Sequence, residues 1–454
     1  MTACMSAFPP VTEELVKRYD VPAPRYTSYP TAPEWKEDIG PAEYAAALKT
    51  AATLGPQAPL SLYVHIPFCK ERCTFCGCNV VIARNQHTAD KYLAMLAREM
   101  DQVAQLLGER NVLSQVHFGG GTPTFLDEEQ LTTLWGAITR RFTVAHDAEV
   151  AIEVDPVVTT RGQLKLLRSF GFNRVSLGVQ DLDPKVQKAI DRIQSEEETR
   201  SVLEYARSLG FTGINVDLIY GLPYQTQESW KRTLSQIVAM RPDRAAVYGF
   251  AYVPEQRTNQ KRLPVAGIPR GAQKLDLFRT AWEAFTSAGY QHIGMDHFAL
   301  PEDELGKAQS KRRLTRNFQG YTVKAEGDVV AVGASAISDV SGLYAQNARG
   351  LPHYYAAIEE GKLATERGFR CSEDDRRRRA VINGIMCNSW VDLGTTRGWE
   401  RELSRLRALE GEGLVTVRGS EVELTPLGRI FVRNVACVFD AYLEHGERLF
   451  SRAV

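Results

Sequence analysis

The chain has 454 residues, of which 44% are hydrophobic and 24% are charged, a composition typical of a globular protein with one large domain and one or two smaller ones. The 55 basic and 55 acidic residues balance to a formal net charge of zero, so no overall field favours nucleic acid or an anionic membrane. The sequence contains no run of 18 apolar residues, and its first ten residues lack the basic and apolar regions of a secretory signal. We therefore expect a cytoplasmic protein with no membrane span and no nucleic-acid partner.

Residues 1–60 are predicted to form an N-terminal extension with one helix, Pro41–Ala52. Before this helix, Arg25–Thr31 reads Arg-Tyr-Thr-Ser-Tyr-Pro-Thr, and the prolines at 24 and 30 prevent it from continuing a helix. The plain interpretation is a surface loop. Its many hydrogen-bonding groups favour a segment that lies over something else.

Four of the eight cysteines lie within ten residues, Cys69, Cys73, Cys76 and Cys78. The first three have the spacing Cys-x-x-x-Cys-x-x-Cys. Soft thiolates suit iron–sulfur clusters, and three of them leave one iron of a cubane cluster open for a substrate. A structural zinc site normally needs a second ligand pair a dozen or more residues away, and a disulfide framework is not expected in a long chain without a signal. The spacing therefore predicts a cluster on Cys69, Cys73 and Cys76. The spacing does not decide whether Cys78 is a fourth ligand of the cluster or a residue that lies beside the ligands.

From residue 61 onward, short strand-like runs alternate with amphipathic helical stretches. The predicted strands are Ser61–Phe68, Ser114–Gly119, Glu149–Asp155, Arg174–Asp181, Gly213–Tyr220 and Arg244–Ala251. The predicted helices are Thr88–Leu107, Glu128–Phe142, Gln163–Phe170, Glu197–Leu209 and Gln227–Met240. Such alternation predicts an α/β fold with a parallel sheet and right-handed crossovers. Because there are six units rather than eight, we expect an open, partial (β/α)6 barrel.

Four of these strands alternate apolar with polar residues, whereas a parallel sheet covered on both faces is apolar throughout. The polar positions are Tyr63, His65, Glu153, Asp155, Ser176, Gly178, Gln180, Asn215 and Asp217. The pattern predicts a lumen shaped for a polar ligand.

The glycine run Gly119–Gly121 follows the second strand and allows a ligand to approach the backbone closely. Glu153 is suited to accept hydrogen bonds from ribose hydroxyls, and Phe75 to pack near an adenine. Arg192 is suited to bind a carboxylate with two hydrogen bonds, although a surface ion pair is its ordinary role.

The character of the chain changes near residue 371, so we predict a catalytic domain over 61–370 and a smaller, mainly helical domain over 371–454. The second contains a helix with the run Arg376–Arg379, a helix near Trp399–Gly411, a hairpin and a last helix, Pro426–His445. This order resembles a winged-helix module. Acidic neighbours make a solvated helix face the better interpretation of the arginine run than a nucleic-acid patch.

Together these segments resemble the oxygen-independent coproporphyrinogen III oxidases of the radical S-adenosylmethionine (SAM) superfamily. The resemblance runs nearly from end to end. It is carried by Arg25–Thr31, the cysteine stretch, Gly119–Thr124, Glu153–Pro156, Gly171–Arg174, Gly178–Asp181, Asp217–Pro223, Gly294–Phe298, Asn317–Tyr321 and Tyr344–Asn347.

The resemblance implies a 4Fe-4S cluster and two SAM molecules. It implies that the cluster-bound SAM contacts Tyr63, Phe75, Gly120, Glu153 and Ile337. It implies that the second SAM contacts Gly121, Thr122, Gln180, Arg192, Asp217 and Ala251. The expected catalytic residues are Tyr63, His65 and Arg25, the last as a contact for a propionate carboxylate. Cys78 matches a cysteine that the family keeps without using it as a ligand.

The implied reaction is oxidative decarboxylation of two propionates of coproporphyrinogen III to vinyl groups, which gives protoporphyrinogen IX for haem synthesis. The implied partners are this substrate and an electron donor of the flavodoxin or ferredoxin type, and we expect a monomer. Arg25–Thr31 is then expected to act as a lid that excludes water. Two alternatives are a radical SAM-type haem chaperone and a metal-binding regulator that uses its C-terminal module. The chaperones typically lack the residue matching Cys78 and the Arg25–Thr31 motif, both of which this chain has.

Overall fold

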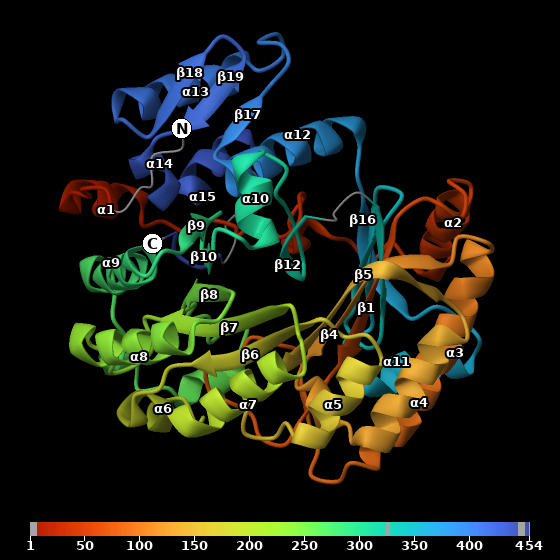
Figure 1. Cartoon of the computed structure of the whole chain (residues 1–454). Helices are drawn as coiled ribbons and strands as arrows, with labels where there is room; N and C mark the ends of the chain where they lie inside the picture. The colour runs from red at the N-terminus through yellow and green to blue at the C-terminus, as the bar shows by residue number, and fades with distance from the viewer. Residues whose placement is uncertain (1–6, 324–326, 444–449, 454) are drawn as a thin grey trace.

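The computed structural model describes residues 7–323, 327–443 and 450–453. Its centre is a twelve-stranded sheet with the order β16-β15-β14-β13-β1-β4-β5-β6-β7-β8-β10-β9. The seven neighbouring strands from β13 to β8 run parallel. Figure 1 shows that the sheet curls, with helices along its outer side. The predicted α/β fold with an open, partial barrel is confirmed.

Most barrel strands and connecting helices lie close to their predicted positions, but β5 begins at Thr143 rather than Glu149, and α6 was not predicted. The strands are β1 Leu60–Ile66, β4 Val112–Gly120, β5 Thr143–Val154, β6 Arg174–Gln180, β7 Gly213–Tyr220 and β8 Arg244–Gly249. The helices are α3 Thr88–Leu107, α4 Glu128–Thr139, α5 Arg161–Ser169, α6 Pro184–Ala189, α7 Glu196–Ser208 and α8 Gln227–Met240. Local signals set several helix starts. Thr160 and Ser195, for example, each form a capping box at the start of α5 and α7.

The alternation along the strands decides which side chains face the helices. In β6, Val175, Leu177 and Val179 are buried in the main core, while Ser176 and Gln180 are only partly buried. The apolar side chains therefore pack under the helices, and the polar ones face the inside of the curled sheet.

The sheet extends beyond the predicted strands on both sides. β13, Asp328–Val332, pairs in parallel with β1, and β14 Ile337–Val340, β15 Leu343–Asn347 and β16 Thr365–Arg370 continue as antiparallel neighbours. On the other side, β10, His297–Ala299, pairs antiparallel with β8 and with β9, Gln291–Ile293. Helices α9 Ala272–Ser287, α10 Glu304–Ser310 and α11 Leu351–Glu359 and the hairpin β11–β12, Thr315–Asn317 and Gly320–Thr322, complete this region. These strands are short and follow no strand–helix unit, so their place in the sheet had no regular signal in the sequence.

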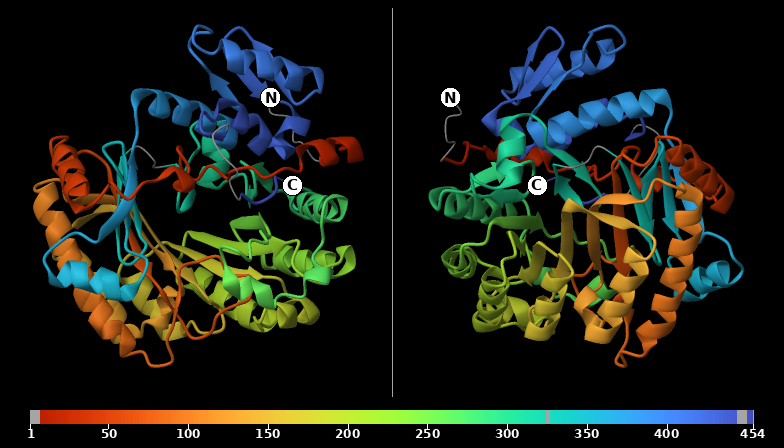
Figure 2. Two further views of the ribbon diagram at one scale, coloured as in Figure 1. Left: turned by 180° about the vertical axis from the view of Figure 1, so that it is seen from behind. Right: turned by 45° about the vertical axis from the view of Figure 1, so that its right-hand side comes forward.

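The N-terminal segment contains α1, Glu13–Tyr19, and α2, Pro41–Ala52, the second as predicted. Between these helices lies a short 3-10 turn, Ala32–Glu34. Figure 2 shows this part of the chain crossing the molecule between the barrel and the C-terminal part. Among the helices described, none combines the length and the apolar character needed to cross a membrane.

The C-terminal part contains α12 Glu373–Asn383, α13 Glu400–Gly411 and a three-stranded sheet of β17 Trp390–Asp392, β19 Glu421–Leu424 and β18 Val415–Arg418. The predicted single helix Pro426–His445 is wrong. It is divided into α14 Pro426–Ile430, α15 Val432–Ala436 and a 3-10 turn, Cys437–Phe439, and its last two residues lie outside the described ones. The break is at Phe431, whose side chain is buried and whose backbone leaves the helical conformation. The division of the chain at residues 60 and 370 stays a prediction.

The arginine run on α12 is only in part the solvated face that the sequence predicts. Arg378 is half-buried and pairs with Asp374 at 2.6 Å and with Glu402 at 2.8 Å. Arg379 pairs with Asp339 of β14. Because these two arginines join α12 to other elements, they are structural contacts.

Candidate functional site

The four cysteines after β1 line one cavity. Their loop begins with β2, Phe68–Cys69, which pairs in parallel with β3, Val81–Ile82, so the loop returns beside its start. The cavity has a volume of about 430 Å³, and we call it the cysteine cavity. Its lining includes Cys69, Cys73, Cys76, Cys78, Phe75, Gly120, Gly121, Thr122, Glu153, Gln180, Arg192 and Asp217. Most of the predicted cofactor residues are thus brought together.

Two amide side chains from a distant part of the sequence hold the backbone of the cysteine loop. Asn259 Nδ2 donates to the carbonyl oxygens of Cys73 at 3.2 Å and of Cys76 at 3.0 Å. Gln260 Nε2 donates to the carbonyl oxygen of Phe75 at 3.0 Å. These bonds fix the loop backbone from which the sulfur atoms project. The sequence analysis missed this pair, because no local pattern distinguishes it from other amides in an irregular segment.

The thiols fit an iron–sulfur cluster. The described cysteines are free of disulfides. Cys69 Sγ lies 3.4 Å from Thr122 Oγ1, and Cys73 Sγ lies 3.8 Å from Arg192 Nη1. Within the described residues, no three His, Cys, Asp or Glu side chains are placed to hold a single metal ion. A cubane cluster makes a different demand, because each thiolate binds a different iron atom. Three separate thiols on one cavity wall therefore fit an iron–sulfur cluster better than they fit a single zinc ion.

Cys78 is a neighbour of Cys76 in this arrangement. The Cys78 backbone N–H donates to Cys76 Sγ at 3.4 Å. Hydrogen bonds from the Cys78 side chain and backbone lower the pKa of Cys76, although burial acts to raise it. A contact of this kind favours the neighbour role for Cys78 over that of a fourth ligand.

The glycine segment after β4 lies directly against the cysteine loop. Gly121 N donates to the Ile66 carbonyl oxygen at 2.8 Å, and Thr122 N donates to that of Phe68 at 2.9 Å. A Cβ atom at position 121 would lie 2.7 Å from the Phe68 oxygen. Only glycine therefore permits this close approach.

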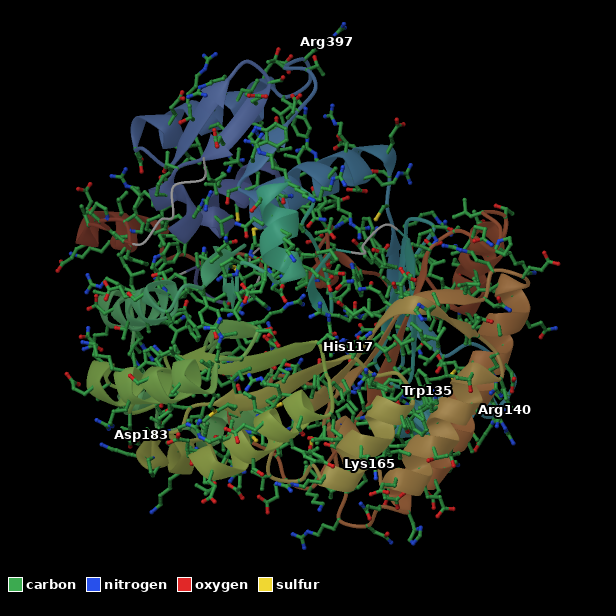
Figure 3. All side chains as sticks on the ribbon, viewed as in Figure 1. His117, Trp135, Arg140, Lys165, Asp183 and Arg397 are labelled. Carbon is green, nitrogen blue, oxygen red and sulfur yellow. The ribbon has the colours of Figure 1, made fainter. Side chains whose placement is uncertain are left out.

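Glu153 lies where the cysteine cavity meets the inside of the barrel. Its Oε2 accepts from Gly120 N at 3.2 Å, and its Oε1 lies 3.1 Å from His117 Nε2. Burial acts to raise the pKa of Glu153, but the hydrogen bond and charge of His117 and the bond from Gly120 outweigh it and lower the pKa. Figure 3 shows His117 inside the curl of the sheet, whereas Arg140, Lys165 and Asp183 lie on its outer side. Glu153 is thus an ionised acceptor inside the barrel.

His65 is buried and fully engaged by the protein. Its Nε2 lies 3.1 Å from the Asn79 carbonyl oxygen and its Nδ1 lies 3.2 Å from the Tyr63 hydroxyl. Because a carbonyl only accepts, Nε2 carries the proton and Nδ1 accepts from Tyr63. Burial lowers the pKa of His65, consistent with this neutral form. The geometry therefore gives His65 a positioning role, which orients Tyr63 and the end of the cysteine loop.

The cysteine cavity is also lined by a half-buried ion pair. Arg192 Nη1 lies 3.0 Å from Asp155 Oδ2, and Arg192 Nη2 donates to the Gly178 carbonyl oxygen at 2.7 Å. Nearby, burial and the charge of Glu153 raise the pKa of Asp217 to about 6, against hydrogen bonds from neighbouring side chains. These groups come from β6, β7 and the loops that follow β5 and α6, all later in the chain than the glycine segment.

Three predicted SAM contacts lie outside the cysteine cavity: Tyr63, which faces the inside of the barrel, and Ile337 and Ala251. Ile337 of β14 packs against the buried cluster of Trp35 and Tyr344. Ala251, just after β8, lines a separate cavity, and its carbonyl oxygen accepts from Gln260 Nε2 at 3.1 Å. Neither side chain reaches the cysteines, so any role toward a ligand stays a prediction.

The segment before Ile337 is held from behind by a buried carboxyl group. Glu99 of α3 is 1% exposed and accepts from Gly333 N at 2.8 Å, Asn347 Nδ2 at 2.6 Å and Tyr354 Oη at 2.6 Å. Burial raises the pKa of Glu99 to about 7, despite these three hydrogen bonds.

A second cavity of about 150 Å³ fills the inside of the barrel and shares Glu153, Ser176 and Asp217 with the cysteine cavity. It is lined also by Tyr63, His117, Asn215, Tyr248, His297, Asn317, Gln319 and Tyr321. The predicted polar lumen is present. The sequence analysis missed His117, although Gln115 and His117 alternate with Val116 and Phe118 in β4.

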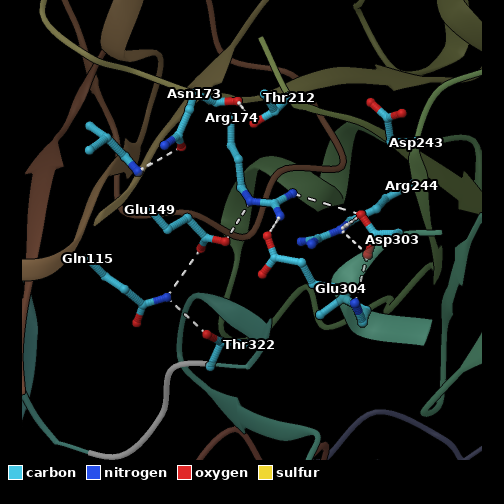
Figure 4. Close-up of polar contacts among 12 residues, drawn as sticks. Gln115, Glu149, Asn173, Arg174, Thr212, Asp243, Arg244, Asp303, Glu304 and Thr322 are labelled. Carbon is cyan, nitrogen blue, oxygen red and sulfur yellow. Dashed lines mark hydrogen bonds and ion pairs between the residues drawn. The ribbon is translucent and has the colours of Figure 1, made fainter. Parts of the chain in front are cut away.

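A polar network forms part of the wall of this inner cavity (Figure 4). Arg174 Nε pairs with Glu149 Oε2 at 2.6 Å, and Arg174 Nη2 pairs with Glu304 Oε1 at 2.5 Å. Gln115 Nε2 donates to Glu149 Oε1 at 3.2 Å and to Thr322 Oγ1 at 2.9 Å. Because these groups bind one another, their hydrogen-bonding capacity is largely used within the wall of the cavity.

The Arg25–Thr31 segment is fixed by its tyrosines. Tyr26 and Tyr29 are buried, and their hydroxyls bond to Asp440 Oδ2 at 2.9 Å and Ala441 N at 3.0 Å. They therefore contact the C-terminal part of the chain. Arg25 instead points to the barrel, where its Nη2 donates to the Gly249 carbonyl oxygen at 2.5 Å.

A comparison with protein families agrees with this geometry. The model described as "Radical SAM superfamily" matches residues 63–237, which include the cysteine loop and the strands β1 to β7. The fold and the cysteine cavity therefore define a radical SAM protein, and this class implies a 4Fe-4S cluster and SAM.

The nearly full-length relatives define the family. An oxygen-independent coproporphyrinogen III oxidase of Pseudomonas aeruginosa is 43% identical over 97% of this chain and 98% of its own length. The enzyme of that name from Escherichia coli K12 is also 43% identical, with the same coverage. A solved structure of the Escherichia coli coproporphyrinogen III oxidase, described as a radical SAM enzyme, superposes with a TM-score of 0.90 at 41% identity and covers 96% of this chain and 99% of that one. The chain belongs to the oxygen-independent coproporphyrinogen III oxidase family.

Proposed function

We propose that the chain decarboxylates two propionates of coproporphyrinogen III to vinyl groups, which gives protoporphyrinogen IX for anaerobic haem synthesis. The observation that carries the proposal is the full-length likeness to enzymes of this name, together with three cysteine thiols in a cavity that adjoins the polar inside of the barrel. The alternative within the superfamily is a haem chaperone. The presence of Cys78 and of the Arg25–Thr31 motif favours the enzyme.

Cys69, Cys73 and Cys76 would hold the 4Fe-4S cluster. When bound, the cluster and SAM supply a 5′-deoxyadenosyl radical that removes a hydrogen atom from the propionate β-carbon, after which CO₂ and one electron leave. The protein's part is to position the reactants and to exclude water. Two sets of hydrogen bonds favour a rigid site for both cofactors. They are the backbone bonds of Gly121 and Thr122 and the bonds from the side-chain amides of Asn259 and Gln260.

Tyr63, Phe75, Gly120, Glu153 and Ile337 are proposed to contact the cluster-bound SAM. For Glu153, the support is an ionised carboxylate at the boundary of the two cavities, because carboxylates accept hydrogen bonds from ribose hydroxyls. For Tyr63, the support is its place in the inner cavity and a hydroxyl oriented by His65. Ile337 has no support beyond the family resemblance.

A second SAM is proposed to contact Gly121, Thr122, Gln180, Arg192, Asp217 and Ala251. The support is that the cysteine cavity is lined also by Gln180 of β6, Arg192 between α6 and α7, and Asp217 of β7. A single ligand bound at Gly120 and Glu153 would not use all of them.

The N-terminal segment is proposed to cover the substrate through Arg25. Its guanidinium lies at the carboxyl end of β8, the edge of a parallel sheet at which ligands bind. Arg25 is suited to bind a propionate carboxylate with two hydrogen bonds. The buried tyrosines beside it anchor the segment.

The remaining partners are proposed on the same basis. One electron must enter for each SAM cleaved, so we propose a donor of the flavodoxin or ferredoxin type. We also propose that the protein is a cytoplasmic monomer.

The test is an anaerobic assay of the reconstituted protein with SAM, a chemical reductant and coproporphyrinogen III. The expected products are protoporphyrinogen IX, CO₂ and 5′-deoxyadenosine, and Cys73→Ser is the matched inactive control. A protein that binds haem tightly and releases no CO₂ under these conditions would be the chaperone instead.

A further inference from the structure

The wall of the inner cavity includes His297, which lies on β10 where this strand pairs with β8. The His297 ring packs edge-on against two tyrosine rings, with ring centres 5.7 Å apart for Tyr248 and 4.9 Å apart for Tyr321. Only 8% of the residue is exposed. These contacts hold the imidazole in place, and the proposed reaction has so far given it no role.

Asp296 fixes the tautomer of this imidazole. The Asp296 side chain is buried, and its Oδ1 lies 2.7 Å from His297 Nδ1. Burial acts to raise the pKa of Asp296, but the hydrogen bond and charge of His297 and the charge of Arg316 outweigh it and lower the pKa. Because an ionised carboxylate only accepts hydrogen bonds, Nδ1 of His297 carries the proton.

The other ring nitrogen of His297 is available to a ligand. Among the residues that the structure describes, Nε2 has no hydrogen-bond partner. In a neutral imidazole with its proton on Nδ1, Nε2 holds a lone pair and accepts a hydrogen bond. Asp296 and His297 together therefore present an acceptor to the inner cavity.

A second acceptor lies on the same wall. Asn215 Nδ2 donates to Ser176 Oγ at 2.7 Å and to Asp217 Oδ1 at 2.8 Å, and these two bonds fix the orientation of the amide. The Asn215 Oδ1 atom is buried and has no hydrogen-bond partner in the described part of the chain. A donor that a ligand brings would satisfy this oxygen.

The charged groups of the inner cavity favour the same kind of ligand. The two arginines of its described lining, Arg174 and Arg244, are paired with carboxylates of the wall. Glu153 and Asp217 lie where the inner cavity meets the cysteine cavity. An ionised propionate is disfavoured beside these two carboxyl groups, whereas an N–H donor is attracted to them.

The arrangement of the two cavities indicates which ligand brings the donor. Within the described residues, the cysteines line the cysteine cavity and not the inner cavity. The cluster and the SAM bound to it therefore belong to the cysteine cavity. The reacting carbon of the substrate must lie next to that SAM, which leaves the adjoining inner cavity to the substrate. Besides its propionates, coproporphyrinogen III carries four pyrrole N–H groups.

We propose that His297 binds the substrate by accepting a hydrogen bond from a pyrrole N–H at Nε2, with Asp296 as the positioning residue that keeps the ring proton on Nδ1. This inference rests on the proposed function. A bond from the macrocycle to a rigid imidazole would help to orient the propionate toward the radical. The amino group of SAM is another N–H donor at this site, and the test separates the two.

The test compares His297→Leu, His297→Gln and Asp296→Asn, with His353→Leu, at an exposed position on α11, as control. Anaerobic ultrafiltration of the cluster-loaded protein measures the Kd of coproporphyrinogen III, and equilibrium dialysis measures that of SAM. Loss of the hydrogen bond predicts that His297→Leu weakens coproporphyrinogen III binding by about 10-fold. His297→Gln should stay within about threefold of the wild type, because its amide oxygen is an acceptor.

Asp296→Asn tests the positioning role. An amide can donate to Nδ1 and so move the ring proton to Nε2, which converts the acceptor into a donor. We therefore expect Asp296→Asn to bind coproporphyrinogen III as weakly as His297→Leu. Iron content and SAM affinity should match those of His353→Leu in each variant.

Three results would overturn the inference. One is an unchanged affinity for coproporphyrinogen III in folded His297→Leu. Another is His297→Gln and Asp296→Asn with equal affinities, a comparison that also serves if His297→Leu does not fold. A third is weaker binding of SAM alone, which would identify the SAM amino group as the donor. The proposed function fails separately, because in that case the wild-type chain itself forms no vinyl product.

Discussion

Arg192→Gln tests whether the half-buried ion pair of the cysteine cavity contributes to both stability and ligand binding. In the native chain Arg192 pairs with Asp155 at 3.0 Å, donates to the Gly178 carbonyl oxygen at 2.7 Å and lies 3.8 Å from Cys73 Sγ. Glutamine keeps a polar end but is too short and neutral to replace these contacts. The substitution therefore leaves a partly buried carboxylate without its cation.

The expected cost follows from this geometry. Two unit charges 3.0 Å apart attract each other by about 5 kcal/mol at an effective dielectric constant of about 20. Removing one partner of a buried pair costs about 3 to 5 kcal/mol. The Arg192 and Asp155 side chains retain 14% and 20% exposure, which favours the lower end, so we expect the free energy of unfolding to fall by about 3 kcal/mol.

The assay is urea unfolding of the reduced, cluster-free protein, followed by tryptophan fluorescence. Arg200→Gln is the matched control, because Arg200 pairs with Glu196 at 2.6 Å but both side chains are 35% exposed. We expect that control to change stability by no more than about 0.5 kcal/mol. In the holoprotein, equilibrium dialysis should show that Arg192→Gln binds one SAM where the wild type binds two. Equal stability of the two variants would refute the energetic reasoning, and two bound SAM molecules in Arg192→Gln would refute the proposed second site.

Three other outcomes are expected. Cys73→Ser should lose the cluster while Cys78→Ser retains it, measured as iron per chain; comparable loss in both would make Cys78 a ligand. Asp217→Asn should bind one equivalent of SAM less than the wild type in dialysis. In the wild type, the affinity of that second site should fall below about pH 6, where Asp217 becomes protonated. A second site whose affinity does not depend on pH would contradict this. The pKa of Glu99 is about 7 in the folded chain, against an ordinary value of 4.5. Protonated Glu99 therefore stabilises the fold at low pH, and the free energy of unfolding falls by about 3 kcal/mol as the pH rises from 4.5 to 7. Glu99→Gln should remove that slope from urea midpoints, and an unchanged slope would assign it to another group.

Some parts of the site followed from local sequence. The spacing of Cys69, Cys73 and Cys76 depends only on neighbouring residues, and a loop of ten residues keeps such side chains close in any compact conformation. The alternation in β6 determines which residues face the helices, because successive side chains of a strand point to opposite faces. Helix starts such as that of α7 followed from a capping box.

Other parts depended on contacts between distant segments. Asn259 holds the cysteine loop from about 180 residues away in sequence, and nothing near it in the chain marks that role. The sequence of Arg25–Thr31 indicated a segment that lies over another part of the molecule, but not that the hydroxyls of Tyr26 and Tyr29 bind the C-terminal part. The prediction of one helix over Pro426–His445 was wrong for the same reason, because Phe431 is buried by tertiary packing and interrupts the helix.

The sequence alone therefore determined the type of chemistry, since thiolate spacing, strand–helix alternation and polar strand faces are local patterns with a direct physical meaning. Only the tertiary structure decided which groups meet. It brought Arg192 to Cys73, placed His65 under the end of the cysteine loop, and gathered Lys274, Arg25 and Arg433 at the end of β8. The physical reason is that ion pairs and hydrogen bonds depend on separation in space, and in a sheet of twelve strands that separation is set by packing across the whole chain.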